Sequence, residues 1–411
     1  MNILFVSDVS ISKATSGAER VLFEQSTLLQ KRGHNVHVLT RKLPEHESNK
    51  EVIQGVTEWR YNIDYSSSSF FVKSILFDCK KLFEFLHNQN SFDVINFHQP
   101  FSAFGVVRSS ASKRIKKIYT CHSLSFEEFR SRNPRPENVT RRILYSLNIQ
   151  IRKHIERKVL KSSDRITVLS QFTQEKLRST YKIPREKIAI IPGGVNLQRF
   201  TPAVDKREIR ERLGLPQEKV MLLTVRDMEP RMGLENLIHA VKIIYLAIPD
   251  VYLVLGGQGP LKANLISLAQ KLEIENYIRF TGFIPEKQLP DYYKMADIFI
   301  LPTVELEGFG LITLEALASG VPVLGTPVGG TVEILNKLDS KYLFKDTKPE
   351  SMASLIVEMC QEFKDNPGHL QDVSSQCRLF VEENYSWEKN VNLLEKVMLD
   401  VVEEGSTFGK D

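Results

Sequence analysis

The chain has 411 residues, of which 42% are hydrophobic and 26% are charged, and its formal net charge is +5. This length exceeds what one hydrophobic core usually serves, so we expect a globular protein of two domains. The four cysteines are scattered, without a C-x-x-C pair or metal-ligand spacing, which favours a reducing compartment over a disulfide framework. No apolar run approaches the roughly 20 residues of a membrane span, and the first residues lack the basic start of a signal peptide, so we expect a cytoplasmic protein.

The first half of the chain alternates short apolar runs with helical patterns. Strand composition is found at residues 2–6, 35–40, 94–97, 118–121 and 166–169, and helical spacing covers residues 19–31. This alternation is typical of parallel βαβ units in a doubly wound sheet. After the first strand, Gly17 lies at the start of a helix, where backbone N–H groups can hold a phosphate. An ordinary helix cap by Thr15 or Ser16 explains the same pattern.

Two histidines follow strands in this half. His98 ends the run at residues 94–97, and His122 ends the run at residues 118–121. The carboxyl ends of parallel strands are where ligands bind in such sheets, so both side chains are site candidates. Purely structural histidines give the same pattern.

A basic segment lies between residues 130 and 165. It contains eleven arginines and lysines against Glu137, Glu156 and Asp164, and apolar residues recur through it at helical spacing. A basic amphipathic helix of this kind can rest on an anionic membrane surface. The alternative is a helix whose apolar face packs in the core and whose basic face is solvated. No aromatic platform or known motif supports nucleic-acid binding.

A second alternating set begins near Lys219. Strand composition recurs at residues 220–225, 252–255, 278–280, 298–301 and 321–324. We therefore expect an α/β protein with two doubly wound, Rossmann-like domains, at residues 1–190 and 191–385. A helix within residues 386–411 is expected to cross back onto the first domain.

Two cations follow the first strand of this set. Arg226 and Arg231 lie before Gly233, and two cations near one strand end can neutralise the developing charge of a diphosphate leaving group without a metal. Surface arginines paired with Glu229 or Glu235 are the alternative. The next strand ends in Gly256-Gly257-Gln258-Gly259, but Lys262 occupies the third glycine position of the G-x-G-x-x-G pattern, which argues against a dinucleotide site.

The stretch from Glu307 to Glu315 (EGFGLITLE) follows the strand at residues 298–301 and opens a helix. Its glycines let the backbone approach a ligand closely, and the free N–H groups of a helix start favour an anion such as phosphate. Glu315 lies inside the helix, where its carboxylate can accept hydrogen bonds from a ribose diol. Two solvated glutamates on an ordinary turn are the alternative.

This stretch resembles the E-x7-E signature of retaining, nucleotide-sugar-dependent glycosyltransferases of the GT-B fold, family 4. Ala316-Leu317-Ala318-Ser319-Gly320-Val321-Pro322 after the signature, and Gly329-Gly330 with Glu333, extend the likeness. The chain departs from the family in two places: Ser16 stands where a first glycine is usual, and Met232 where a lysine is expected. A one-residue shift of register would place Asp227, instead of Arg226, opposite the family arginine.

The resemblance implies two domains that face each other across a cleft and a metal-independent transfer of sugar from a nucleotide, expected to be UDP, to a glycan or lipid-linked hydroxyl. No cofactor is expected. The implied catalytic residues are His122, Glu307, Arg226 and Arg231. The implied donor-binding residues are Gly17, Arg226, Arg231, Gly257, Phe283, Ile284, Glu307, Gly308, Phe309, Gly310, Leu311 and Glu315.

Two other classes of function fit parts of this pattern. A nucleotide-sugar epimerase shares the two-domain architecture, and a non-catalytic protein that binds sugar nucleotides would tolerate the methionine at position 232. The sequence leaves open the sugar, the base, the acceptor and the oligomeric state. The basic segment at residues 130–165 is the candidate for contact with an anionic membrane on the cytoplasmic face, and a core-packed helix with a solvated basic face stays the alternative.

Overall fold

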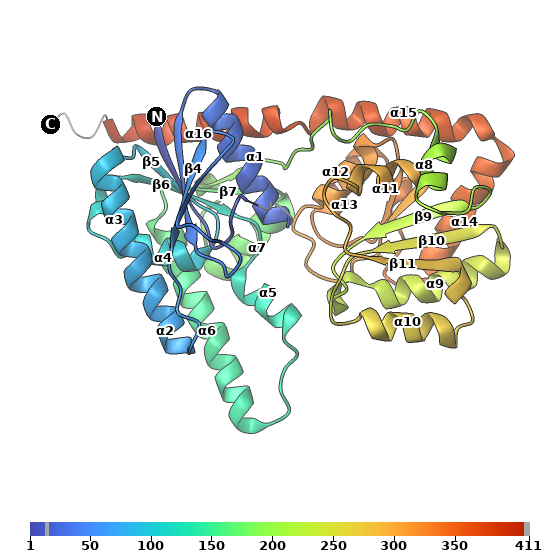
Figure 1. The fold of residues 1–411 in the computed structure, drawn as a ribbon, viewed down its shortest axis with the longest axis horizontal. Helices are drawn as coiled ribbons and strands as arrows, with labels where there is room; N and C mark the ends of the chain where they lie inside the picture. Colours follow the sequence, from blue (N-terminus) through green and yellow to red (C-terminus); the bar gives the residue numbers. More distant parts are fainter. Residues whose placement is uncertain (13–15, 407–411) are drawn as a thin grey trace. The chain divides into compact units, whose positions relative to one another are not determined.

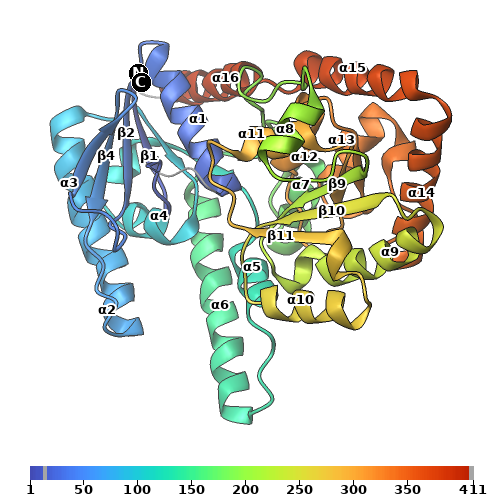
Figure 2. The same ribbon diagram turned by 45° about the vertical axis from the view of Figure 1, so that its right-hand side comes forward.

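The structure is a computed structural model that describes residues 1–12 and 16–406. Two units make up the chain: unit 1 comprises Met1–Gly193 and Trp387–Asp411, and unit 2 comprises Gly194–Ser386. Each is an α/β unit with one sheet, as Figures 1 and 2 show. Thr15, one of the two candidate helix caps, and the last five residues of the predicted C-terminal segment lie outside the described residues.

The sheet of unit 1 has the strand order β3-β4-β2-β1-β5-β6-β7-β8 over the described residues. All neighbouring strands are parallel except the β3–β4 pair. The strands are β1 (Asn2–Val6), β2 (Asn35–Arg41), β3 (Lys50–Ile53), β4 (Val56–Tyr61), β5 (Val94–Phe97), β6 (Lys116–Cys121), β7 (Arg165–Val168) and β8 (Ile188–Ile190).

The central strand β1 is an unbroken apolar run because both faces of the sheet are covered. Its residues from Ile3 to Val6 are fully buried, as expected of a strand inside a parallel sheet with helices on both sides. The helices of unit 1 are α1 (Gly17–Lys31), α2 (Ser68–Lys73), α3 (Cys79–Asn90), α4 (Pro100–Val107), α5 (Ser125–Arg132), α6 (Val139–Ser162), α7 (Gln171–Tyr181) and α16 (Trp387–Ser406).

The C-terminal helix α16 completes the core of unit 1. Its Val391, Leu394 and Met398 are fully buried in one cluster with Ile3 and Leu22, and Figure 1 shows it beside α1. Arg32 also forms an ion pair with Glu395 of α16, with 2.6 Å between Nη1 and Oε2. Residues from opposite ends of the chain therefore share one hydrophobic core.

Only the second half of α6 packs in a hydrophobic core of unit 1, and its cluster is a different one from that of α16. Val159 and Leu160 are fully buried, whereas Ile143, Leu144 and Leu147 are more than half exposed. In both Figure 1 and Figure 2 the first half of α6 extends beyond the sheet of unit 1. The alternative in which the apolar face of this helix packs in the core is therefore wrong for its first three turns.

Unit 2 has a wholly parallel sheet of order β11-β10-β9-β12-β13 in its described residues. Its strands are β9 (Val220–Val225), β10 (Val251–Gly256), β11 (Ile278–Gly282), β12 (Ile298–Leu301) and β13 (Val323–Gly325). Its helices are α8 (Lys206–Arg212), α9 (Leu234–Ala247), α10 (Lys262–Lys271), α11 (Leu289–Met295), α12 (Leu311–Ala318), α13 (Thr331–Leu338), α14 (Pro349–Asp365) and α15 (Pro367–Asn384).

The strand order of unit 2 reverses at β9. The chain first adds β10 and β11 on one side of β9 and then adds β12 and β13 on the other. Ligands of open α/β sheets bind beyond the carboxyl ends of the strands at such a switch point, here between β9 and β12. Among the described residues, no helix combines the length and the apolar character needed to span a bilayer.

Candidate functional site

The predicted site residues of unit 2 meet at this switch point. Arg226 is the first residue after β9, and the segment from Pro302 to Gly310 connects β12 to α12. Strand β9 pairs with β12 through Ile298–Leu222 and Phe299–Leu223, so the two strand ends lie side by side. The site is therefore built by parallel pairing of strands that are distant in the sequence.

Arg226 and Glu307 form a nearly buried ion pair. Arg226 Nη2 donates to Glu307 Oε2 at 2.7 Å, and the two side chains are only 8% and 11% exposed. The same Nη2 lies 3.1 Å from Thr303 Oγ1 and 2.8 Å from Met232 Sδ, while Thr303 Oγ1 donates to Glu307 Oε2 at 3.2 Å. Two side chains, Arg226 and Thr303, thus fix one oxygen of Glu307, and an ion pair with so little solvent depends on such contacts.

Glycines hold the backbone of Glu307 in place. Gly329 has a φ of +70°, and a Cβ there would lie 2.1 Å from Glu307 O, closer than any side chain permits. Gly330 donates its N–H to that same oxygen at 2.8 Å. The Gly329-Gly330 pair is thus required because two backbone segments touch at the site, a cause that does not depend on a ligand.

A close backbone contact also explains the glycine at position 257. Its φ is +129°, and a Cβ would lie 1.8 Å from Arg226 O. The turn after β10 therefore packs against the backbone of Arg226 and supports the ion pair from the other side. Ile284 is buried with its Cδ1 next to Gly256, whereas Phe283 is 54% exposed. Ligand contacts of Gly257, Phe283 and Ile284 stay predictions.

Arg231 lies on the short helical turn Pro230–Met232 and donates from Nη1 to Leu306 O at 3.0 Å. Its guanidinium is therefore beside the turn that carries Glu307. Met232 is buried and contacts the guanidinium of Arg226. Arg226 forms its ion pair with Glu307. The alternative of a surface arginine paired with Glu229 or Glu235 is therefore wrong for Arg226. Asp227, the residue of the alternative register, is exposed.

Helix α12 begins at Leu311, within the stretch predicted to open a helix, after Gly310 in a left-handed conformation with φ of +93°. Phe309 is buried and packs edge-to-face against Tyr385, with 6.1 Å between ring centroids. The amides of the segment from Gly308 to Leu311 thus sit on a fixed backbone at a helix N-terminus, where partial positive charge favours an anion.

Glu315 is 2% exposed and accepts a 2.8 Å hydrogen bond at Oε2 from Tyr293 Oη. Tyr293 is itself fully buried on α11, between Phe200 and Phe299. The second glutamate of the motif is therefore oriented by a tyrosine, and the alternative of two solvated glutamates is wrong.

In unit 1, His98 and His122 form a pair at the ends of β5 and β6. Their Nδ1 and Nε2 atoms are 3.1 Å apart. Burial lowers the pKa of His122 to about 4, and burial beside His122 holds the pKa of His98 well below its usual range. Both rings are thus neutral at pH 7, when one can donate to the other. The donor contacts that the resemblance implies for His122 and Gly17 stay predictions.

Ser16 caps α1 by the ordinary means. Its hydroxyl accepts from Glu19 N, and Glu19 Oε2 accepts from Ser16 N at 2.8 Å, which together make a capping box. The local sequence is therefore explained by helix capping. Elsewhere in residues 1–12 and 16–406, no three His, Cys, Asp or Glu side chains come together as a metal-binding group.

Three contact residues escaped the sequence interpretation: Thr303, Tyr293 and the thioether of Met232. Thr303 follows Pro302 directly after an apolar strand, which was the available signal. Tyr293 lies on another helix and gives no local signal.

Two curated relatives and one solved structure illustrate what the chain is similar to. It is 34% identical over 192 residues to a "GDP-mannose-dependent alpha-(1-6)-phosphatidylinositol monomannoside mannosyltransferase" of Mycolicibacterium smegmatis, covering 45% of this chain and about half (49%) of that protein's length. It is 26% identical to an uncharacterised glycosyltransferase of Methanocaldococcus jannaschii, over 88% of both chains. A sucrose-phosphate synthase from Thermosynechococcus elongatus superposes with a TM-score of 0.81 at 20% identity, over 98% of this chain and 100% of that one.

That superposition confirms the predicted fold, two Rossmann-like sheets of the GT-B class. Two family models cover most of the sequence. Residues 15–199 match the model described as Glycosyltransferase Family 4, and residues 205–366 match Glycosyl transferases group 1. The chain belongs to the glycosyltransferases that these two models describe, Glycosyltransferase Family 4 and Glycosyl transferases group 1.

Proposed function

We propose that the chain transfers a sugar from a nucleoside diphosphate donor to a hydroxyl of a glycan or lipid-linked acceptor, with retention of anomeric configuration and without a metal. The observation that carries this proposal is the buried Arg226–Glu307 pair beside the α12 N-terminus, at the switch point of unit 2. A carboxylate for sugar hydroxyls and amides for phosphate oxygens lie there on one short segment, as a nucleotide sugar requires.

Glu307 orients the transferred sugar by accepting hydrogen bonds from its hydroxyl groups. Oε2 already has two partners in Arg226 and Thr303, so the carboxylate is pre-organised before substrate arrives. The amides from Gly308 to Leu311 bind the diphosphate, and Arg231 supplies a cation next to this turn. Glu315 accepts from the ribose hydroxyls. Arg226 acts on the donor in two ways. It orients Glu307, and it supplies a positive charge next to Met232, the position where the family has a lysine.

In the transfer step, the acceptor oxygen forms a bond to the anomeric carbon on the face from which the diphosphate leaves. The bond between that carbon and the diphosphate oxygen breaks, and the leaving phosphate accepts the proton of the acceptor hydroxyl. Cations and amides stabilise the charge that develops on the leaving group. Glu307 forms no covalent intermediate. This route predicts full activity in excess EDTA and an α-linked product from an α-linked donor.

The test is Glu307→Gln, which keeps the shape of the side chain and removes its charge. We expect transfer and donor hydrolysis to fall by at least 100-fold, the range typical of a lost electrostatic contact in a transition state. Glu305→Gln is the matched control, because Glu305 is exposed and two residues away. A Glu307→Gln protein that folds and turns over at the wild-type rate overturns the proposal.

The base of the donor is the least constrained element. UDP is the expectation from the resemblance, whereas the Mycolicibacterium smegmatis relative is named as GDP-mannose-dependent. A thermal-shift screen of UDP, GDP and ADP with their sugars separates these outcomes, since a bound nucleotide stabilises the folded state by mass action. Turnover with GDP-mannose and none with UDP-sugars would replace UDP by GDP in the proposal.

We also propose that the acceptor reaches the protein at an anionic membrane on the cytoplasmic face, through the basic segment at residues 130–165. The support is charge: eleven cations stand against three acids in that segment. Transfer to a lipid-linked acceptor in vesicles should then exceed transfer to its soluble headgroup at equal concentration.

A further inference from the structure

The most exposed apolar surface of α6 has no partner among the described residues of unit 1. Val139, Ile143, Leu144, Leu147 and Ile151 are between 49% and 69% exposed. Residues four apart lie above one another on a helix, so these side chains form a single stripe along its first three turns. Contiguous exposed apolar surface of this kind marks an interaction site in most soluble proteins.

Side chains on the opposite side of α6 contact unit 1 from Tyr145 onward. Tyr145 donates to Asn133 O and lies 5.4 Å from the ring of Phe129, and Ile149 packs against the core of unit 1. Arg152 stacks over Phe101 and Phe129 at 5.0 and 4.6 Å. The helix thus contacts unit 1 on one side through Tyr145, Ile149 and Arg152 and presents its apolar stripe outward on the other.

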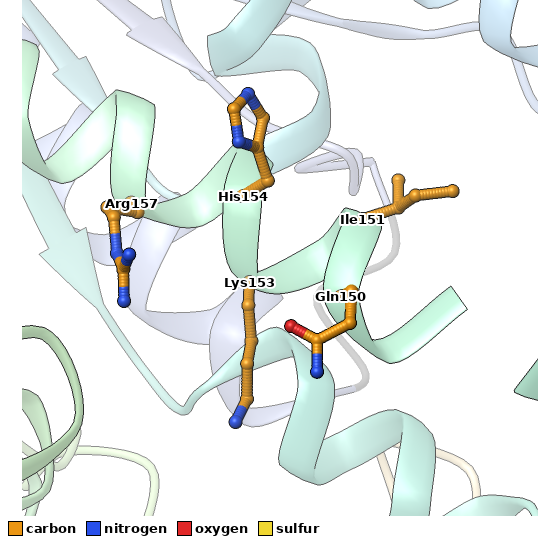
Figure 3. Close-up of a pocket in the computed structure, with 5 residues that line it drawn as sticks. All are labelled: Gln150, Ile151, Lys153, His154 and Arg157. Carbon is orange, nitrogen blue, oxygen red and sulfur yellow. The ribbon is translucent and has the colours of Figure 1, made fainter. Parts of the chain in front are cut away.

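The charges of α6 are of one sign. Its only acid, Glu156, is fully buried, whereas it carries seven cations, namely Arg141, Arg142, Arg152, Lys153, Arg157, Lys158 and Lys161. The outward side therefore changes along the helix from apolar, at residues 139–151, to basic, at residues 157–161. Figure 3 shows the five residues that line a hollow of about 410 Å³ on this helix, Gln150, Ile151, Lys153, His154 and Arg157.

More apolar side chains are exposed at the same end of unit 1. Phe70 on α2 is 48% exposed, and Phe77 on the π-helical turn Ser74–Asp78 is 61% exposed. Figures 1 and 2 both show α2 at the end toward which α6 projects. Lys73 and Lys81 add exposed cations there.

We infer that this end of unit 1, formed by the outward stripe of α6 with Phe70 and Phe77, inserts into the interface of an anionic bilayer. The apolar side chains enter the headgroup boundary, and Arg157, Lys158 and Lys161 bind lipid phosphates. This combination of apolar burial and basic charge is what interfacial helices use. The inference names the surface that makes the proposed membrane contact. It rests on the proposed function only for the reason why the protein would bind a membrane, namely to reach a lipid-linked acceptor.

The charge pattern argues against the two other occupants. A second copy of the chain would bring two α6 helices of like charge together with no exposed acid on either, which is repulsive. A nucleic acid would contact the cations but would leave the apolar stripe in water. An anionic lipid surface satisfies both halves of the helix.

The experiment is co-flotation of the full chain with vesicles of phosphatidylglycerol and phosphatidylcholine, without any sugar nucleotide. We expect binding at 0.1 M salt to phosphatidylglycerol-rich vesicles and little to pure phosphatidylcholine. The triple variant Ile143→Ser, Leu144→Ser, Leu147→Ser should lose at least tenfold in affinity. Lys158→Gln with Lys161→Gln should lose roughly fivefold to thirtyfold, at about 1 kcal/mol per cation near the surface.

Matched controls keep these results specific. Val204→Ser with Leu246→Ser removes exposed apolar side chains of unit 2, and Lys271→Gln with Lys287→Gln removes exposed cations there, so both should bind like the wild type. The substituted α6 side chains are exposed, so circular dichroism should show unchanged folding. A Leu144→Trp variant should shift its fluorescence to the blue on vesicles.

Two results overturn the inference: a wild-type protein that stays with the soluble fraction at every lipid composition, or one that dimerises in sedimentation while the triple variant does not. Neither bears on catalysis, because turnover with a soluble acceptor is measured separately. If Glu307→Gln turns over at the wild-type rate while the wild-type protein still binds vesicles, only the proposed function is wrong and the membrane inference stands.

Discussion

The guanidinium of Arg226 lies 2.7 Å from the carboxylate of Glu307, and this pair joins residues 81 positions apart in the sequence. Arg226 directly follows β9 and Glu307 lies on the connection after β12, at the point where the strand order of unit 2 reverses. Because the pair is nearly buried, removing one partner leaves a charge without compensation in a poorly solvated place.

Loss of either partner should therefore destabilise unit 2. We expect Arg226→Met or Glu307→Met alone to lower the free energy of unfolding by about 3 kcal/mol. The double variant should cost much less than the sum, since two apolar side chains replace two charges. Urea unfolding followed by far-UV circular dichroism gives the values. Strictly additive effects would show that the two charges do not interact.

Thr303 should matter for catalysis more than for donor binding. Its hydroxyl lies between Arg226 and Glu307 and fixes the orientation of the carboxylate. Thr303→Val should lower kcat roughly tenfold, the worth of one hydrogen bond to a charged group, and change the donor KM less than twofold. Thr303→Ser should restore the rate.

The matched control for Thr303 is Thr224→Val. Thr224 is also fully buried, on β9, but its hydroxyl has no hydrogen-bond partner among the described residues. Removing it should leave kcat unchanged. If Thr303→Val and Thr224→Val behave alike, the hydroxyl of Thr303 has no special role.

Tyr293 should affect nucleotide affinity. Its hydroxyl donates to Glu315 Oε2 in a buried site, so Tyr293→Phe leaves that carboxylate short of one donor. We expect the Kd of the nucleoside diphosphate to rise roughly tenfold, a loss of about 1.4 kcal/mol. Calorimetry on Tyr293→Phe, with Tyr292→Phe as the neighbouring control, measures the effect. Equal nucleotide affinities in both variants would show that the hydrogen bond to Glu315 does not contribute to nucleotide binding.

Glu156 should make the stability of unit 1 pH-dependent. It is fully buried, accepts from Ser125 N at 3.1 Å and from Tyr181 Oη, and burial raises its pKa to about 7. An unfolded glutamate titrates near 4.5, so the folded state holds its proton over a range in which the unfolded state has lost it. Stability from this group is therefore complete below pH 4.5 and is lost as the pH rises to 7, by at most roughly 3 kcal/mol.

Glu156→Gln isolates this contribution. The difference in unfolding free energy, variant minus wild type, should grow in favour of the variant from pH 5 to pH 8. Both tryptophans of the chain, Trp59 and Trp387, belong to unit 1, so tryptophan fluorescence in urea reports on that unit. A difference that stays constant with pH would show that the carboxyl of Glu156 titrates normally.

The periodicity of the sequence predicted the strands of unit 2 to within two residues at each end. Apolar runs such as Ile298–Leu301 are unambiguous because both faces of a parallel strand are buried. The antiparallel hairpin of β3 and β4 was missed. Strand β3 is largely exposed at the sheet edge, with the burial pattern of a polar segment, so no hydrophobic signal marks it.

For the site, the sequence named Glu307, Glu315, Arg226 and the glycine turns but could not assign their partners. The ion pair of Arg226 and Glu307 depends on the register of β9 against β12. The support of Glu315 by Tyr293 depends on a hydrogen bond between α11 and α12, which are distinct elements of the chain. Hydrogen bonds between residues far apart in the sequence leave no periodic trace in it.

The sequence by itself determined the two-sheet architecture and the family of this protein, because hydrophobic period and motif spacing are local properties of the chain. Only the tertiary structure decided which charges are paired and which apolar side chains remain uncovered. Arg226 is neutralised by Glu307 because strand order brings them together, and Leu144 is exposed because no other element of unit 1 covers that side of α6. Burial depends on neighbours that come from distant parts of the chain, so helical spacing alone could not distinguish a core face from an exposed one.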